Sequence, residues 1–495
     1  MKTLSNILGA ALCVASLCAP AVWAQQQAPD QTQQQTPSDQ GATQPSGPIP
    51  AYRSPLASAA NNDEDTETNT DVTPDTHSLT GAQNFTLGTP TSRSYWQPHF
   101  DITSTVDSNP VENAGQSSWS TWTSFFGGID VHRTSGNSDL TLNYVGGGMV
   151  SNNSSASNGV VQELNFSDRF SFRRWAITFL DELRYLPESS AGFGGLGGGA
   201  FPGGGSLGGG LGPGQSLLTG RGQNLGNSFY TEVDTFLSAR TSLTFVGGYS
   251  LLHYFDNDLL NYGTANFRAG YNYQLNRKNT IGVSYTFGDY SYSNSDQSFI
   301  DHTAQVSYGR RVTGRLAFRI AAGPQVVFSH LPISPSSGSA GGGTGSTNTS
   351  STTQVYWSLS TNLQYQLNRT GLGLAYNHGV GGGSGVLAGS LEDIVSGSAT
   401  RQVSRTFSSG VTGGYSRNKG LAIGTTVPSS QTYDYWFGGA SLSHPVGRSL
   451  GLTLSYQLQY QTSNAAFCTG PTCGTSVIRH MISFGVGWHE RPLLF

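Results

Sequence analysis

The stretch Leu450–Gln461, LGLTLSYQLQYQ, alternates between apolar residues and small or polar residues. Its even-numbered positions carry Leu or Tyr, and its odd-numbered positions carry Gly, Thr, Ser or Gln. Successive side chains of a β-strand point to opposite faces, so this stretch has one apolar face and one wet face. The pattern predicts a β-strand that separates an apolar environment from water.

The same alternation recurs from about Trp96 to the end of the chain. Clear examples are Ala265–Asn276, Ile281–Phe287 and Val355–Leu367. No segment shows a sustained helical period instead. We therefore predict an all-β fold over residues 93–495.

The breaks between these segments alternate in length along the chain. Short polar connections are expected around Arg240-Thr241, Asn276–Asn279, Gly309–Gly314, Asn368–Gly371, Ser404–Thr406 and Val446–Ser449. Long connections are expected around Pro187–Asn227, Asp256–Gly263, Ser291–Gln297, Pro332–Thr352, Gly379–Leu391, Asn418–Ser430 and Ser463–Gly474. Short turns on one side and long loops on the other are typical of an outer-membrane barrel.

The segments amount to about 18 strands, each long enough to cross a bilayer when tilted. Their expected starts are Phe100, Ser118, Ser138, Gly159, Phe172, Ser228, Ser242, Thr264, Thr280, Phe299, Arg315, Thr353, Gly371, Asp393, Phe407, Thr432, Leu450 and Thr475. An even number places both ends of the barrel on the side of the short turns. The predicted fold is a transmembrane antiparallel up-and-down β-barrel.

The composition excludes several other classes of protein. Charged residues make up 11% of the 495 residues, against about 25% in soluble domains. A hydrophobic fraction of 36% and a mean hydropathy of −0.28 exclude a helical protein that spans the membrane many times. The net charge of −4 provides no basic face for nucleic acid.

The N-terminal part differs in composition from the rest of the chain. Met1–Ala24 has the pattern of a secretory signal peptide, with Lys2 before a short apolar core and Val22-Trp23-Ala24 before the cleavage point. Residues 25–92 are rich in Gln and Pro and contain an acidic patch, so we expect a disordered linker.

Cleavage of the signal peptide removes Cys13 and Cys18 and leaves Cys468 and Cys473 in the mature chain. Exported proteins meet oxidising conditions, so we expect a disulfide between these two residues. Two sulfurs without further ligands nearby do not make a metal site, and the sequence gives no sign of a cofactor.

Taken together, these features resemble a Gram-negative outer-membrane β-barrel of the porin-like kind over Trp96–Phe495. In that family the last strand ends in an aromatic residue, which the barrel-assembly machinery reads. Phe495 and the apolar face of Ile482, Phe484, Val486 and Trp488 fit this pattern, whereas Arg491 and Pro492 interrupt it. The resemblance implies export through the periplasm to the outer membrane, with lipid around the barrel.

Several side chains have an expected place on this barrel. Aromatic residues near strand ends are candidates for the interfacial girdles: Trp119, Trp122, Tyr249, Tyr254, Tyr308, Trp436 and Trp488. Charged residues that alternation turns inward are candidates for lining a pore: Arg268, Arg315, Arg319, Glu232 and Asp234. Charges in a pore bias its ion selectivity.

The favoured function is a water-filled pore, monomeric or trimeric, for passive diffusion of small hydrophilic solutes. One alternative is a structural or adhesive barrel that acts through its long external loops, of which the Gly-rich Ala191–Gly214 is the largest. The other is a hydrolase, although none of the ten histidines lies in a Gly-x-Ser-x-Gly or His-Glu-x-x-His motif. We therefore expect that the protein is not an enzyme.

Overall fold

The computed structural model describes residues 94–108, 119–151, 158–187, 223–255, 259–293, 297–332, 349–382, 387–421, 431–464 and 476–494. The signal peptide, residues 25–92, the Gly-rich loop 191–214, both mature cysteines and Phe495 lie outside the described residues. Helices long and apolar enough to cross a membrane are not found in the part of the chain that the structure describes.

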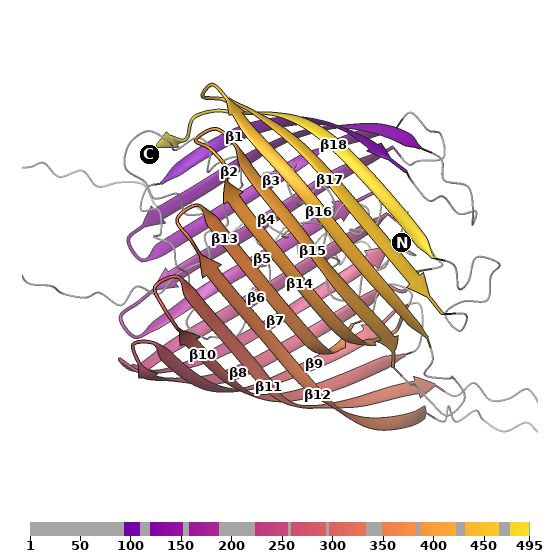
Figure 1. The fold of residues 1–495 in the computed structure, drawn as a ribbon. Coiled ribbons are helices and arrows are strands. Elements are labelled where there is room, and N and C mark those ends of the chain that lie inside the picture. Colours follow the sequence, from indigo (N-terminus) through magenta and orange to yellow (C-terminus); the bar gives the residue numbers. More distant parts are fainter. Residues whose placement is uncertain are drawn as a thin grey trace, which may run out of the picture. The chain divides into compact units, whose positions relative to one another are not determined.

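The regular elements in the described ranges are β-strands, and all but the last run the length of the sheet (Figure 1). They are β1 (Tyr95–Asp107), β2 (Ser120–Ser135), β3 (Ser138–Ser151), β4 (Gly159–Ser171), β5 (Trp175–Leu186), β6 (Asn224–Ser238), β7 (Thr241–Tyr254), β8 (Tyr262–Asn276), β9 (Asn279–Tyr292), β10 (Ser298–Arg311), β11 (Leu316–Pro332), β12 (Thr349–Gln366), β13 (Thr370–Gly381), β14 (Ser390–Gln402), β15 (Ser408–Gly420), β16 (Thr432–Val446), β17 (Leu450–Ser463), β18 (Val477–His489) and β19 (Leu493–Leu494).

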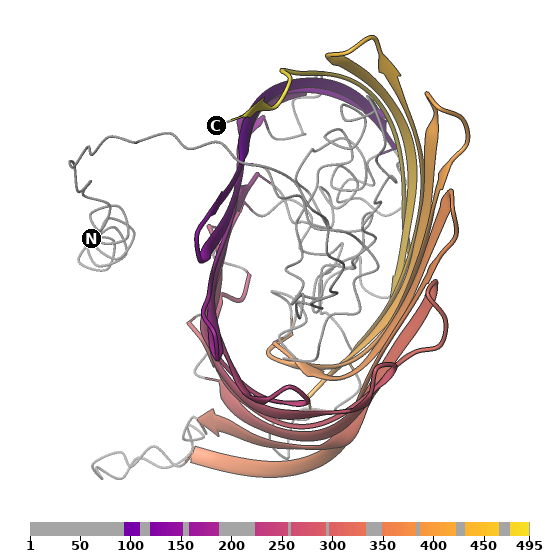
Figure 2. The ribbon, with the colours of Figure 1, turned by 90° about the vertical axis from the view of Figure 1, so that its left-hand side faces the viewer.

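Each strand from β1 to β17 pairs antiparallel with the next one along the chain. The sheet closes because β18 pairs with β1 from His99↔His489 to Asp107↔Met481. Figure 2 shows the resulting ring of strands. The predicted up-and-down barrel and its strand count are confirmed.

The predicted alternation of connection lengths is also confirmed. Two residues separate Ser238 of β6 from Thr241 of β7, whereas the connection from β5 to β6 extends from Leu186 to Asn224. Some short turns require glycine: Gly136 between β2 and β3 has a φ of 56° and Gly447 between β16 and β17 a φ of 71°. Backbone of this left-handed kind favours glycine because it lacks a Cβ atom.

Burial follows the same alternation, with polar side chains inside and apolar side chains outside. On β1, Asp101 and Thr105 are 4% and 0% exposed, whereas Phe100 and Ile102 are 43% and 40% exposed. On β18, Ser483 is 5% exposed. A soluble barrel would show the opposite arrangement, so the exposed apolar band faces lipid. The chain is therefore a transmembrane β-barrel.

The prediction of interfacial aromatic residues was wrong for two of them. Trp122 and Tyr254 are each 4% exposed and point into the barrel. They occupy inward positions because the strand phase places Phe125 and Tyr249, at 45% and 50% exposure, on the outer face. Trp119, Trp436 and Trp488 are exposed as expected, at 60%, 53% and 40%.

Strand boundaries differ from the prediction by a few residues. The first strand begins at Tyr95 rather than Phe100, because this segment pairs with β2 and its first two residues, Tyr95 and Trp96, also pair with β19. Sequence alternation did not show this pairing, since β19 is only a short extension after the interruption by Arg491 and Pro492.

A buried ion pair joins the first and last strands on the inner face. Arg479 of β18 donates from Nε to Asp107 Oδ1 at 3.1 Å and from a terminal nitrogen to Asp107 Oδ2 at 2.5 Å. The two side chains are 7% and 2% exposed. Thr105 Oγ1 and Ser483 Oγ, at 2.8 Å, add a hydrogen bond across the same seam. The closure therefore has side-chain links as well as a backbone ladder.

Replacing Arg479 with Met should lower the temperature at which the barrel unfolds, as read from its heat-modifiable mobility in SDS gels. Removing one partner of a buried pair leaves an uncompensated charge and costs about 3–5 kcal/mol. The double variant Arg479→Met/Asp107→Asn should recover much of this loss. Arg417→Met is the control, since Arg417 is exposed and lies 3.9 Å from Asp434. Equal effects of Arg479→Met and Arg417→Met would contradict this account of the seam.

The β10–β11 ladder contains a local break that depends on a glycine. Pairing stops between Thr303↔Gln325 and Val306↔Ala322, where Pro324 has no N–H to donate. At this break the backbone of β10 approaches Gly323 so closely that a Cβ there would overlap the carbonyl oxygen of Ala304. Side chains therefore do not fit at position 323.

Gly323→Ala should sharply reduce the yield of heat-modifiable barrel, because backbone, unlike a flexible side chain, cannot move aside cheaply. Gly438→Ala is the matched control, since a Cβ at Gly438 would meet nothing within 4 Å. Folding yields after refolding into detergent measure both effects. Normal yield of Gly323→Ala would show that the approach of the two strands is not obligatory.

Candidate functional site

The candidate pore-lining charges Glu232, Arg268 and Arg319 lie on the inner wall and influence one another electrostatically. Glu232 on β6 and Arg268 on β8 both flank Val246 of β7 in the strand register. Neighbouring strands are about 4.8 Å apart, so two long side chains can approach each other over the intervening Val246. Glu232 and Arg268 accordingly attract one another, and the charge of Arg268 acts on Arg319 of β11.

Hydroxyl groups hold parts of this cluster in place. Arg268 donates to Ser284 Oγ of β9 at 3.0 Å. Thr244 Oγ1 of β7 donates to Asp234 Oδ1 at 2.6 Å, and Asp234 lies beside Glu232. These bonds fix Arg268 against β9 and Asp234 against β7 on the same wall.

Arg315 is placed apart from the other candidates. It lies in the turn before β11, its side chain is exposed, and its N–H donates to Thr313 Oγ1 at 3.1 Å. The turn extends this far because Val312 N–H donates to Leu316 O at 2.8 Å, so the strand begins at Leu316. Alternation along β11 predicted that the Arg315 side chain faces inward. The strand begins only at Leu316, so the alternation does not extend to Arg315.

Arg169 on β4 was not among the predicted residues, yet its charge acts on Glu232. The signal that could have identified it is the phase of β4. Val161 is 1% exposed and faces inward, and Arg169 shares its odd-numbered phase. We call Arg169, Glu232, Asp234, Arg268 and Arg319 the charged wall.

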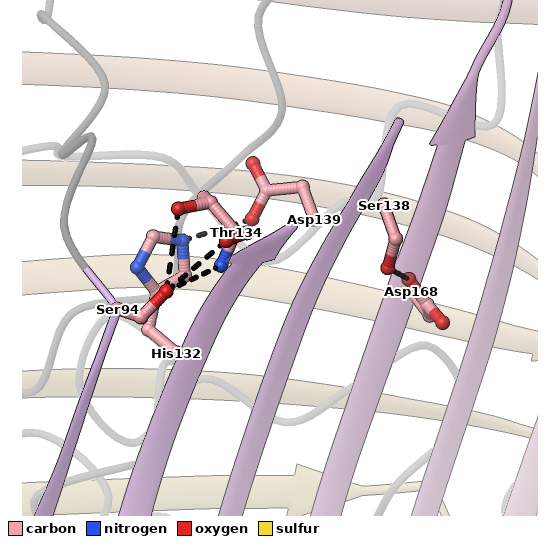
Figure 3. Close-up of polar contacts among 6 residues, drawn as sticks. All are labelled: Ser94, His132, Thr134, Ser138, Asp139 and Asp168. Carbon is pink, nitrogen blue, oxygen red and sulfur yellow. Dashed lines mark hydrogen bonds and ion pairs between the residues drawn. The ribbon is translucent and has the colours of Figure 1, made fainter. Parts of the chain in front are cut away.

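A second polar cluster lies at the turn end of β1–β4 (Figure 3). His132 Nε2 contacts Asp139 Oδ1 at 2.9 Å across β2 and β3. Ser94 Oγ donates to the carbonyl oxygen of Thr134 at 3.2 Å and accepts from the Thr134 N–H at 3.0 Å. Each contact links two strands, so the cluster fastens this rim of the barrel. Ser138 of β3 likewise donates to Asp168 of β4 at 2.9 Å.

Histidine–carboxylate contacts also occur at His378 and His99. His378 Nδ1 lies 2.6 Å from Asp393 Oδ1, and His99 Nδ1 lies 3.6 Å from Asp130 Oδ2. A serine hydrolase needs, in addition, a nucleophilic hydroxyl bonded to the imidazole. Of the two serines in Figure 3, Ser94 instead bonds to Thr134 and Ser138 to Asp168. Within the described ranges, His378 stacks on Trp357 at 3.7 Å and bonds to no serine.

The described residues contain no group of three or more His, Cys, Asp or Glu side chains arranged to hold a metal ion. The chemistry that this inner surface offers is therefore polar: hydrogen bonds from Ser, Thr, Asn and Gln, together with the mixed charges of the charged wall.

If the inner wall is hydrated, Ser284→Cys should react with a charged methanethiosulfonate reagent in intact membranes. Val283→Cys, on the next residue and 55% exposed toward lipid, should resist it because the reagent does not enter hydrocarbon. Both variants are made with Cys468 and Cys473 changed to Ser, and labelling is read by mass. The reverse order of reactivity would contradict the assignment of inner and outer faces.

Comparisons with known proteins give fold-level likeness alone. No protein-family model matches the sequence, and no curated protein matches it. Solved structures that the chain is similar to include Pseudomonas aeruginosa OccK8 (OprE), with 11% identity and a TM-score of 0.37 over 81% of this chain and 98% of that one. Pseudomonas aeruginosa OccK2 (OpdF), in complex with glucuronate, has 10% identity and a TM-score of 0.40 over 81% and 98%. Acinetobacter baumannii OccAB3 has 11% identity and a TM-score of 0.38 over 80% and 99%. These values are too low for any property of those proteins to be assigned to this chain.

Proposed function

We propose that the protein is a pore in the outer membrane through which small hydrophilic solutes diffuse passively. The observation that carries this proposal is the inward polar face of the seam, where Gln97, Asp101, Thr103 and Thr105 alternate with lipid-facing Phe100. A polar inner face has a physical purpose where it meets water or a polar solute. Barrels of 16–18 strands are wide enough to leave an aqueous channel.

The mechanism needs no chemical step. Inner-wall hydroxyl and amide groups replace part of the hydration of a passing solute, while the charged wall sets its preference for ions. In the charged wall, Arg169, Arg268 and Arg319 stand against Glu232 and Asp234, so we expect each of these charges to influence the ion selectivity of the pore. On this proposal the protein is not an enzyme, because no residue is required to make or break a bond.

The N- and C-terminal segments serve delivery and assembly in this proposal. Met1–Ala24 directs export and is removed, residues 25–92 form a linker, and a disulfide between Cys468 and Cys473 fastens a loop. The barrel-assembly machinery reads the last strand near Phe495. The exposed faces of Ile482, Phe484 and Trp488, at 45%, 51% and 40%, support the last of these roles because they supply the apolar pattern of a terminal strand.

The purified full-length barrel should produce stable single-channel conductance in a planar bilayer. A tight seal would contradict the pore and would favour the structural or adhesive alternative. Under a salt gradient, Arg268→Gln should shift the reversal potential toward cation preference, and Glu232→Gln should shift it toward anion preference. Arg315→Gln is the matched control, because Arg315 lies in an exposed turn and should leave the reversal potential unchanged.

A further inference from the structure

Strand β12 is bonded unequally to its two neighbours. It pairs with β11 over nearly its whole length, from Pro332↔Thr349 to Leu316↔Tyr365. It pairs with β13 only from Leu359↔His378 to Gln366↔Gly371. Within the described residues, β13 therefore does not pair with the first half of β12. We call this divergence, between 349–358 of β12 and 379–381 of β13, the split.

At the split, β13 leaves the wall and turns into the barrel. Continuing the register would pair Val380 with Trp357 of β12. Instead, Val380 N–H donates to Gln325 Oε1 at 2.9 Å, and Val380 O accepts from Gln325 Nε2 at 3.4 Å. Gln325 belongs to β11, on the far side of β12. Figure 2 shows the β13–β14 end inside the ring, apart from the end of β12.

The side-chain amide of Gln325 takes the place of β12 as the hydrogen-bonding partner of Val380. A primary amide offers one acceptor and one donor edge, as a peptide group does, so it can satisfy both backbone groups of Val380. The amide is itself held by Asp301, which accepts from Gln325 Nε2 at 2.6 Å and from Thr303 Oγ1 at 2.9 Å. Tyr292 of β9 donates to the carbonyl oxygen of Gly382, the residue directly after β13, at 2.5 Å. The inward position is thus anchored by side chains of three other strands.

Behind the split, the inner wall carries an apolar and aromatic cluster, as it also does around Trp122 and Phe126 of β2. Tyr292, Phe299, Val327 and Leu421 form a buried cluster, against which Tyr262, Tyr290, Tyr356 and Val380 pack. The rings of Tyr290 and Phe299 are stacked with centroids 4.3 Å apart. These side chains offer apolar ring faces together with phenolic hydroxyls.

On the outer side of the split, apolar side chains face lipid. Val355 and Trp357 of β12 are 70% and 53% exposed, and Trp357 stacks on His378 of β13. Beyond Val355 the outward positions become Thr353 and Ser351, so the split lies where the apolar band ends. Tyr356 faces inward between the outward-facing Val355 and Trp357, so this part of β12 carries large apolar side chains on both its inner and its outer face.

We propose that the split is a lateral exit, through which small amphipathic molecules with an apolar body and a polar group pass between the lumen and the outer leaflet. This rests on the proposed pore function, because the lumen must admit the molecule. Long loops of such barrels lie outside the cell, which places the split at the outer leaflet. Hydrophilic solutes continue along the axis, since apolar side chains do not replace their hydration.

The experiment closes the split with a disulfide. Tyr356→Cys/Gly381→Cys would join positions that the extended register places opposite each other. Ser360→Cys/Asn377→Cys is the matched control inside the intact ladder, where the register places the two residues opposite each other. Both pairs are made in full-length protein with Cys468 and Cys473 changed to Ser, and mass spectrometry confirms the bond.

The probe for the lateral route is 1-N-phenylnaphthylamine, whose fluorescence rises in the bilayer of Gram-negative cells that carry the barrel. Oxidised Tyr356→Cys/Gly381→Cys should reduce its uptake to that of cells without the barrel, and reduction should restore it. The control pair should leave uptake unchanged. Arabinose-driven swelling of proteoliposomes, which follows the axial route, should be the same for all variants.

Unchanged phenylnaphthylamine uptake after the split is closed would overturn the lateral exit while leaving the pore intact. A joint loss of phenylnaphthylamine and arabinose permeation would also overturn it, because the β13–β14 end would then act on the axial route. Absence of arabinose swelling in the wild type would instead contradict the pore.

Gln325→Leu tests the lateral exit without a disulfide. Losing the amide removes the partner of Val380 and should return β13 to β12, so phenylnaphthylamine uptake should fall. Gln305→Leu, which removes an amide bonded to Ser358 Oγ at 3.0 Å, should leave uptake unchanged. Wild-type uptake by Gln325→Leu would overturn the proposal.

Discussion

The structure depends on one constraint: within hydrocarbon, every backbone N–H and C=O must find its partner inside the protein. A sheet meets that condition by closing on itself, and here β18 returns to β1 along His99–Asp107. The seam joins residues far apart in sequence, so it forms after both ends of the chain have been made. Its buried Arg479–Asp107 pair gives the junction a side-chain lock in addition to the ladder.

Closure also determines where each kind of side chain goes. Alternate residues face lipid, so apolar side chains such as Phe100 and Phe484 are exposed, and the polar residues between them face inward. The charged wall follows from the same geometry. Its Arg and acidic side chains are positioned by neighbouring strands and hydroxyl groups, which turns a scattered set of charges into one surface.

The split between β12 and β13 shows how the constraint is met where the ladder is interrupted. Val380 has no partner on β12, and the Gln325 amide supplies two hydrogen bonds in its place. The glycines that follow, Gly381 and Gly382, allow the chain to pass close to Glu392 and Tyr290. A departure from regular pairing is thus stabilised by a specific side chain, which makes it a feature of the fold.

The alternation LGLTLSYQLQYQ and its repeats determined the strands, their approximate ends, the alternation of turns and loops, and the membrane-facing side of most strands, because these depend on local order along the chain. The tertiary structure alone decided that Trp122 and Tyr254 turn inward, that Arg315 remains in a turn and that Arg169 joins the charged wall. It also decided that β13 bonds to β11 across β12. Each of these depends on strand register or on contacts between residues distant in sequence. A period of two residues carries no information about which strands pair or in which register.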